Sequence, residues 1–136
     1  MNTPSFFDIT GLSPRSAARW DQIEEAEHEL GCQFPEDYRA FLKESNGVEG
    51  FVCSSAYLVL WPVQEIAQLN AAYATTEFAP GLVLLGTNGG NIGYGFTGSQ
   101  ANLRYVQVPL IGMDLDVMEP IGKTLIEMVK HMCLGS

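Results

Sequence analysis

Two glycine-containing stretches match the letters of phosphate-binding motifs. Residues 93–98 fit the pattern G-x-G-x-x-G, which binds a dinucleotide when it opens a helix whose N-terminus faces the pyrophosphate. The residues that follow are typical of a strand, so this context is missing. Residues 122–124, Gly-Lys-Thr, match the end of a second motif, but Val117 stands where its first glycine should be. We therefore expect no nucleotide cofactor.

The two histidines and three cysteines could supply a base and a nucleophile. A thiol nucleophile needs a base within hydrogen-bond reach, and only spatial proximity could pair a cysteine with His131. His28 follows Glu24 and Glu25 by about one helical turn, which is typical of a solvated surface histidine. The histidines lie far apart in the sequence, so a zinc site is not expected. The sequence therefore predicts neither an enzyme nor a metal centre.

The cysteines also bear on the redox environment. Cys32, Cys53 and Cys133 form an odd set without a C-x-x-C pair or a metal-ligand spacing. Such a set is typical of free thiols in a reducing compartment. The first residues also lack the basic start and the long apolar stretch of a secretory signal. We therefore expect three free thiols and a cytoplasmic protein that folds without a disulfide.

A short acidic stretch near the C-terminus could attract a hard cation. Asp114, Asp116 and Glu119 place three carboxylates close together in the sequence. Met113 and Met118 add adaptable apolar side chains to the same stretch. A mixed acidic and apolar surface suits protein recognition better than tight calcium binding. We expect this stretch to contact a protein and to hold no metal.

The overall charge narrows the class of partner. Seven Lys and Arg against 16 Asp and Glu give a formal net charge of −9. This charge repels phosphate backbones and anionic lipid and favours a basic partner, although acidity also serves solubility by itself. The longest stretch without charge, residues 78–103, is interrupted by glycines and polar residues. We therefore expect no direct nucleic-acid partner and no membrane segment.

Helical periodicity dominates the first half of the chain. A helix over residues 13–30 should begin with the pair Ser13–Pro14 and end at Gly31, which can supply a left-handed cap. Two further helices are expected over residues 35–46 and from Pro62 onward. The residues expected to face the core from the first two helices are Trp20, Ile23, Ala26, Leu30, Tyr38, Phe41 and Leu42.

Strand signals dominate the second half. Residues 51–54 and 57–61 have strand character, and residues 82–112 predict three antiparallel strands. A final helix over residues 120–134 is apolar on most sides, so it should pack deeply against the sheet. The length suits one domain with a self-sufficient core. We expect a single α+β domain over residues 1–136, with an antiparallel-rich central sheet flanked by about four helices and a less ordered segment 1–12.

One ordered set of residues resembles a known family. It runs Leu-Gly, Pro, Tyr, Phe-Leu and Asn-Gly, and a glycine-rich turn follows later in the chain. The positions are Gly31, Pro35, Tyr38, Phe41, Leu42, Asn46, Gly47, Gly86, Gly89 and Gly90. Together they resemble the signature of the SUKH superfamily of bacterial immunity proteins. The resemblance implies an α+β fold whose sheet is flanked by helices, and a protein that binds and neutralises a cognate toxin domain.

The resemblance leaves the partner open. Some relatives regulate other processes, as the fungal cell-wall assembly regulator does. Acidic residues are common in the family just beyond the glycine turn and after the Tyr-x-Phe strand, whereas Asn91, Ile92 and residues 97–98 are neutral here. This difference bears on the identity of the partner more than on the fold.

We therefore expect a non-catalytic protein-binding domain, an immunity protein whose acidic surface binds a toxin domain with a basic surface. The alternatives are a regulatory or scaffolding domain without a toxin partner, and an unrecognised hydrolase. The oligomeric state is left open. The residues expected to bind the partner are Glu24, Glu25, Glu29, Asp114 and Asp116.

Overall fold

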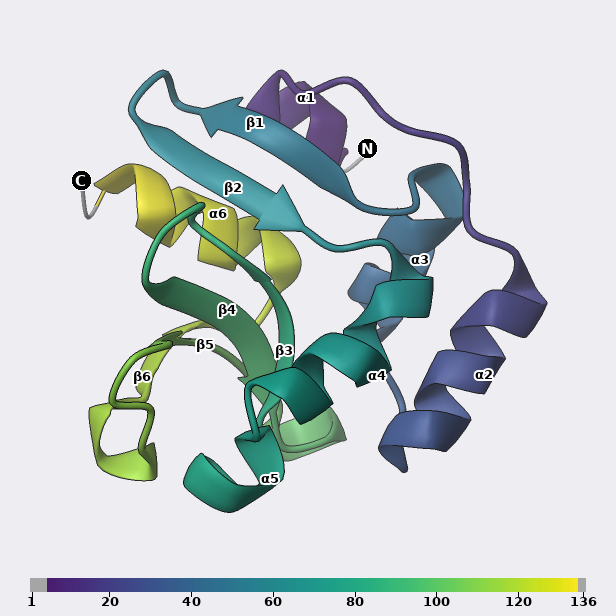
Figure 1. Cartoon of the computed structure of the whole chain (residues 1–136). Coiled ribbons are helices and arrows are strands. Elements are labelled where there is room, and N and C mark those ends of the chain that lie inside the picture. Colours follow the sequence, from purple (N-terminus) through teal and green to yellow (C-terminus); the bar gives the residue numbers. More distant parts are fainter. Residues whose placement is uncertain (1–4, 135–136) are drawn as a thin grey trace.

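The computed structural model describes residues 5–134, which contain one six-stranded antiparallel sheet with its strands in sequence order (Figure 1). The strands are β1 (Val48–Val52), β2 (Ala56–Leu60), β3 (Val83–Thr87), β4 (Ile92–Thr97), β5 (Arg104–Pro109) and β6 (Glu119–Gly122). The α-helices are α1 (Phe6–Thr10), α2 (Trp20–Leu30), α3 (Glu36–Glu44), α4 (Val63–Ala72), α5 (Thr75–Phe78) and α6 (Leu125–Leu134). Two 3-10 helices are η1 (Gln100–Asn102) and η2 (Leu115–Val117). The predicted α+β class and antiparallel sheet are confirmed.

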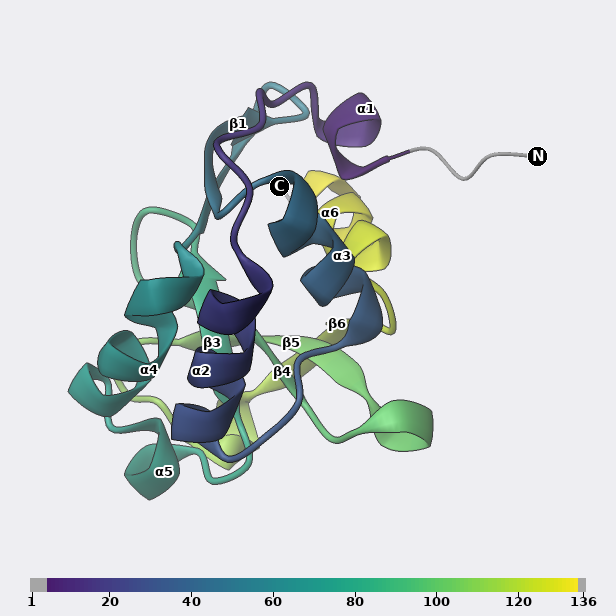
Figure 2. The ribbon, with the colours of Figure 1, turned by 90° about the vertical axis from the view of Figure 1, so that its right-hand side faces the viewer.

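The helices pack around the sheet in two groups. Helix α6 packs against β5 and β6, and α1 lies against α6. Helix α4 packs against β3, and α2 lies beside α4 (Figure 2). Strand β2 pairs with β3 over only two residue pairs, so the β1–β2 hairpin extends away from the rest of the sheet. Within residues 5–134, no helix has the length and apolar composition needed to cross a bilayer.

Helix α2 begins later than predicted, at Trp20. The backbone of residues 13–19 bonds instead to the neighbouring segment, since the Ala18 amide donates to the Leu42 carbonyl at 2.8 Å. A helix would need this amide within its own hydrogen-bond ladder. Trp20 therefore stands in the first turn and is 49% exposed, so its prediction as a core residue is wrong. The other predicted core residues are buried, apart from the partly buried Leu30: Ile23, Ala26, Tyr38, Phe41 and Leu42.

Helix α6 also begins later than predicted, at Leu125 rather than near Pro120. The residues before it form the edge strand β6, in which Pro120 stands opposite Val106 of β5. An edge strand tolerates proline because one side of it needs no hydrogen-bond donor. The Asp37 carboxylate on α3 accepts a hydrogen bond from the Leu125 amide at 2.7 Å and so caps α6. A carboxylate distant in the sequence therefore fixes where this helix starts.

Part of the N-terminal segment predicted to be less ordered forms helix α1. The Ser5 hydroxyl accepts a hydrogen bond from the Asp8 amide at 3.2 Å, which caps the helix. Phe6 is buried, and its ring centroid lies 4.8 Å from that of Phe41. Residues 1–4 lie outside the described residues.

The Asn46–Gly47 pair connects α3, β1 and α4. The Asn46 side-chain oxygen accepts a hydrogen bond from the Val63 amide at 2.7 Å, which satisfies a free amide at the start of α4. Gly47 has a φ of 88°, and a Cβ there would lie 2.7 Å from the Leu60 carbonyl oxygen. Only glycine therefore lets the start of β1 approach the end of β2 this closely.

The other motif residues also serve the fold. A Cβ on Gly86 would collide with the Val59 carbonyl oxygen on β2, so glycine is required where β3 meets that strand. The remaining residues lie in caps, turns and the core: Gly31 ends α2, Pro35 precedes α3, Gly89 and Gly90 lie between β3 and β4, and Tyr38, Phe41 and Leu42 are buried. The motif residues therefore have structural roles in caps, turns, close strand contacts and the core.

The prediction of three free thiols is wrong. Cys53 in the β1–β2 turn and Cys133 in α6 form a disulfide with their Cα atoms 5.7 Å apart, and Cys32 is free. The two paired cysteines are 80 residues apart, so their contact depends on tertiary packing that spacing does not reveal. The first predicted strand also ends early, because Cys53 and Ser54 take positive φ angles in the turn. The disulfide removes the thiol argument for a reducing compartment.

Candidate protein-binding surfaces

Helix α2 carries the first of the two acidic surfaces predicted from the sequence. Glu24, Glu25 and Glu29 are exposed, while Ile23 and Ala26 of the same helix are buried. Glu25 and Glu29 also line a groove of about 180 Å³ between α2 and α4. The helix therefore presents carboxylates both to open solvent and to a shallow groove.

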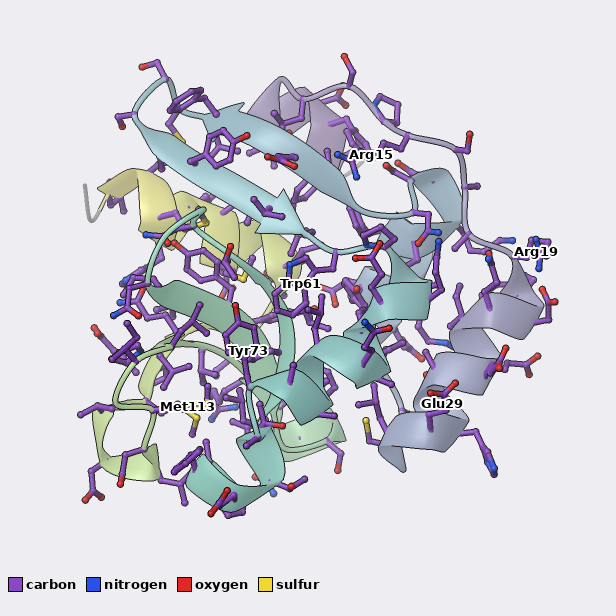
Figure 3. All side chains as sticks on the ribbon, in the orientation of Figure 1. Arg15, Arg19, Glu29, Trp61, Tyr73 and Met113 are labelled. Atoms are coloured by element: carbon purple, nitrogen blue, oxygen red, sulfur yellow. A yellow bond between two sulfur atoms is a disulfide. The ribbon has the colours of Figure 1, made fainter. Side chains whose placement is uncertain are left out.

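The loop between β5 and β6, residues 110–118, carries the second acidic surface and is called the η2 loop here. Asp114 and Asp116 are exposed, and the Asp114 carboxylate accepts a hydrogen bond from the Asp116 amide at 2.8 Å. Met113 beside them is only 6% exposed and anchors the loop (Figure 3). Three aliphatic side chains of the loop face solvent: Ile111, Leu115 and Val117, at 82%, 45% and 49% exposure. Exposed aliphatic groups interleaved with carboxylates make this loop a candidate protein-binding surface.

The two acidic surfaces are not brought together by the fold. Figure 3 shows Glu29 on α2 and Met113 in the η2 loop on opposite sides of the molecule, with α4 and α5 between them. A partner that contacts one surface must therefore extend across the molecule to contact the other. The five residues predicted to bind the partner thus lie on two separate surfaces.

A third surface is a pocket that the sequence analysis did not predict. It has a volume of about 400 Å³ and lies between the β1–β2 hairpin, the sheet and α6; we call it the hairpin pocket. Its lining includes Phe51, Tyr57, Tyr94, Gln107, His131 and Met132. These residues come from five elements, β1, β2, β4, β5 and α6, that only the folded chain brings together. A sequence signal exists only in part, as aromatic residues on both sides of the β1–β2 turn.

Two carboxylates are bonded to residues that line the hairpin pocket. The Tyr57 hydroxyl donates to the Glu49 carboxylate at 2.6 Å, and the Gln107 amide donates to the Glu119 carboxylate at 3.2 Å. The hydrogen bond to Glu49 raises the pKa of the Tyr57 hydroxyl above its ordinary value. Arg15 lies 3.8 Å from Glu49, and both side chains are about half exposed. The pocket therefore combines aromatic walls with neighbouring acceptors.

Two cationic side chains lie over the exposed Trp20 ring. The Arg39 guanidinium and the Lys43 ammonium lie 5.1 and 5.0 Å from the centre of this ring. Such cation–π contacts stabilise an exposed indole. Arg39 is also 3.5 Å from the Glu27 carboxylate. The basic groups of this patch are thus engaged within the chain itself.

The groups that could support catalysis have other roles in the structure. The disulfide occupies Cys53 and Cys133, and burial, together with the Glu27 charge, raises the pKa of the Cys32 thiol, which disfavours a thiolate nucleophile. Residues 93–98 lie in strand β4 and the turn after it. The Asp37 carboxylate already occupies the N-terminus of α6, beside residues 122–124. Among the described residues, no group of three or more His, Cys, Asp and Glu could hold a metal ion.

Comparison with known proteins places the chain in a family. Residues 18–131 match the model of the SMI1 / KNR4 family (SUKH-1). The match covers more than half of the chain and includes all six strands and most of α6. No curated protein matches the sequence.

Proposed function

Because the chain belongs to the SMI1 / KNR4 family (SUKH-1), we propose that it is a non-catalytic protein-binding domain that acts as an immunity protein. In this proposal it binds a cognate toxin domain and blocks access to the toxin's active surface. The net charge of −9 favours a toxin domain with a basic surface.

The exposed side chains of the η2 loop support this proposal most directly. Three exposed aliphatic side chains offer apolar contact area, and Asp114 and Asp116 offer charge for a basic partner. The loop is also held in place before binding. Asn91 accepts hydrogen bonds from the Ile111 amide with its side chain, at 2.8 Å, and from the Leu110 amide with its carbonyl, at 2.7 Å. A loop ordered in advance loses less conformational entropy when it binds.

Helix α2 has a different role in this proposal. Its carboxylates Glu24, Glu25 and Glu29 lie far from the η2 loop, without a comparable set of exposed aliphatic side chains. Long-range attraction needs charge but no contact, and it raises the rate at which a basic partner approaches. We propose that α2 steers the partner and that the η2 loop contacts it.

Co-expression of the chain with the toxin domain from a neighbouring reading frame tests the function. The wild type should restore growth of the host cell, and the double variant Asp114→Lys/Asp116→Lys should restore much less. The control variant Glu36→Lys/Glu44→Lys reverses two exposed carboxylates on α3 and should protect like the wild type. Equal protection by the wild type and both double variants would contradict the role of the η2 loop. No protection by the wild type would contradict the immunity function itself.

The regulatory or scaffolding alternative uses the same binding chemistry with another partner. It predicts a stable complex that depends on the η2 loop and contains no toxin domain. Chemical cross-linking in the host, with the wild type and with Asp114→Lys/Asp116→Lys side by side, separates the two. A partner that cross-links to the wild type but not to the variant, and that does not inhibit growth, would favour the regulatory alternative.

A further inference from the structure

We infer that the hairpin pocket is a binding site for a basic side chain, arginine or lysine, of a protein partner. The inference deepens the proposed function, because it names the chemistry that the partner must present. The pocket also borders the proposed contact loop. Gln107 lines the pocket and stands opposite Glu119 in the sheet, and Glu119 directly follows the η2 loop. The pocket therefore lies one strand away from the residue at which the η2 loop ends.

Three aromatic side chains line part of the pocket. Phe51 and Tyr57 are cross-strand partners in the hairpin, and their ring centroids lie 4.9 Å apart in an edge-to-face arrangement. Tyr94 lines the pocket from the sheet. Phe51 is 64% exposed, at a position where a polar side chain could face solvent equally well. Aromatic faces attract guanidinium and ammonium groups, and an exposed ring gains a second face of contact when a cation binds.

Acceptors beside the pocket match a basic side chain. The carboxylates of Glu49 and Glu119 are bonded to Tyr57 and Gln107, so an entering cation meets two anionic groups next to its aromatic walls. Arg15 competes for Glu49, but this ion pair is long at 3.8 Å and half exposed, so it is weak and exchangeable. Among the described residues that line the pocket, His131 is the one with a basic side chain.

The same charges disfavour other occupants. An acidic side chain would be repelled by Glu49 and Glu119. A second copy of this chain would bring another net charge of −9 to the interface. A basic segment of a different protein is therefore the occupant that the surface fits.

The walls of the pocket are also held in place covalently. Phe51 and Tyr57 flank Cys53 in the hairpin, and His131 and Met132 directly precede Cys133 in α6. The Cys53–Cys133 disulfide therefore ties two opposite walls together. A pocket that is already formed needs less reorganisation to bind a side chain.

The test uses three blocked tripeptides, acetyl-Gly-Xaa-Gly-amide with Arg, Gln or Glu as the central residue. Each is titrated into the full oxidised chain, and amide chemical shifts are followed by NMR. The arginine peptide should shift amides of residues 51–57, 94, 107 and 131–132, with an affinity at least about 3-fold above that of the glutamine peptide. The glutamate peptide should shift none of them. Equal binding of the arginine and glutamine peptides, or shifts that lie elsewhere, would overturn the inference.

Matched variants locate the site. Phe51→Ala should weaken the arginine peptide about 3-fold, whereas Phe78→Ala, which removes another half-exposed ring outside the pocket, should not. Glu119→Gln should also weaken it, with Glu44→Gln as its control. If Phe51→Ala disturbs the hairpin, the result for Glu119→Gln decides whether the site exists. Unchanged affinity for the arginine peptide in both variants would rule out the site. The peptide titration needs no toxin, so the two tests are independent. Failure of the peptides to bind would not contradict the immunity function, and failure of the growth assay would not contradict the proposed site in the hairpin pocket.

Discussion

At the scale of single residues, two buried tyrosine hydroxyls have opposite surroundings. The Tyr105 hydroxyl donates to the Asp37 carboxylate at 2.7 Å, and the same carboxylate caps α6. The Tyr38 hydroxyl is fully buried and has no hydrogen-bond partner among residues 5–134. Burial raises the pKa of both hydroxyls well above their ordinary value, and the Asp37 charge raises that of Tyr105 further. Both tyrosines therefore stay neutral in the folded protein at neutral pH.

These surroundings predict opposite effects of the same substitution. Tyr105→Phe should lower the free energy of unfolding by about 2 kcal/mol, because it removes a hydrogen bond to a charged group. Tyr38→Phe should leave the free energy unchanged or raise it by up to about 1 kcal/mol, because it removes a buried polar group that lacks a partner. Urea unfolding followed by tryptophan fluorescence measures both. A loss in Tyr38→Phe as large as that in Tyr105→Phe would mean that the Tyr38 hydroxyl is bonded.

The raised pKa values also predict the behaviour at alkaline pH. Tyrosines in the unfolded chain lose their protons near pH 10, while Tyr38 and Tyr105 keep theirs in the folded chain. Their contribution to stability is therefore complete below pH 10 and is lost as the pH rises above it, by about 1.4 kcal/mol per pH unit for each tyrosine. Unfolding at pH 9 to 11 should show a steeper loss for the wild type than for Tyr38→Phe. Parallel curves for the two proteins would contradict the assignment.

At the scale of elements, local patterns predicted which residues are buried better than where helices start. The spacing of Ile23, Phe41 and Leu42 depends on helical geometry, and all three are buried. The pair Ser13–Pro14 is a local signal for a helix start, but the Ala18 amide finds its partner in Leu42. A local signal shows that a helix can start, and distant hydrogen bonds decide whether it does.

The candidate surfaces also differ in whether local sequence could predict them. The η2 loop was predicted because its carboxylates and apolar residues are adjacent in the sequence, and the structure exposes them together. The hairpin pocket was not predicted, because the residues that line it come from positions as distant in the sequence as Phe51 and Met132. A surface built from several elements becomes visible only when the strand register and the packing of α6 are known.

The aromatic contacts of α3 predict a large effect of one truncation. Phe41 is 4% exposed and packs against the rings of Phe6, Phe7 and Tyr38. Phe41→Ala should therefore cost about 3 to 5 kcal/mol of stability. Trp20→Ala is the control, because this half-exposed ring should cost less than about 1 kcal/mol. Thermal and urea unfolding measure both, and equal costs for the two would refute this account of the core.

At the scale of the whole molecule, the Cys53–Cys133 disulfide closes a long loop that contains most of the sheet. In the chain-entropy model a loop of this length contributes about 4 kcal/mol by restricting the unfolded chain. Reductant, or the double variant Cys53→Ala/Cys133→Ala, should therefore lower the melting temperature markedly. Cys32→Ala should not, because that thiol is free. A melting temperature unchanged by reductant would show that the pair does not contribute to stability.

The placement of the acidic surfaces on opposite sides of the molecule predicts two kinetic signatures with the toxin partner. Glu24→Lys/Glu25→Lys/Glu29→Lys should slow association at low salt and leave dissociation nearly unchanged, because charges that only steer act before contact. Asp114→Lys/Asp116→Lys should slow association and also speed dissociation, because these residues lie among aliphatic groups proposed to stay in contact. Both effects on association should shrink as salt rises, since the screening length falls below about 10 Å above 0.1 M. Surface plasmon resonance at several salt concentrations measures both rates. If neither cluster changes association at low salt, the net charge of this chain serves solubility, and recognition depends on its apolar groups.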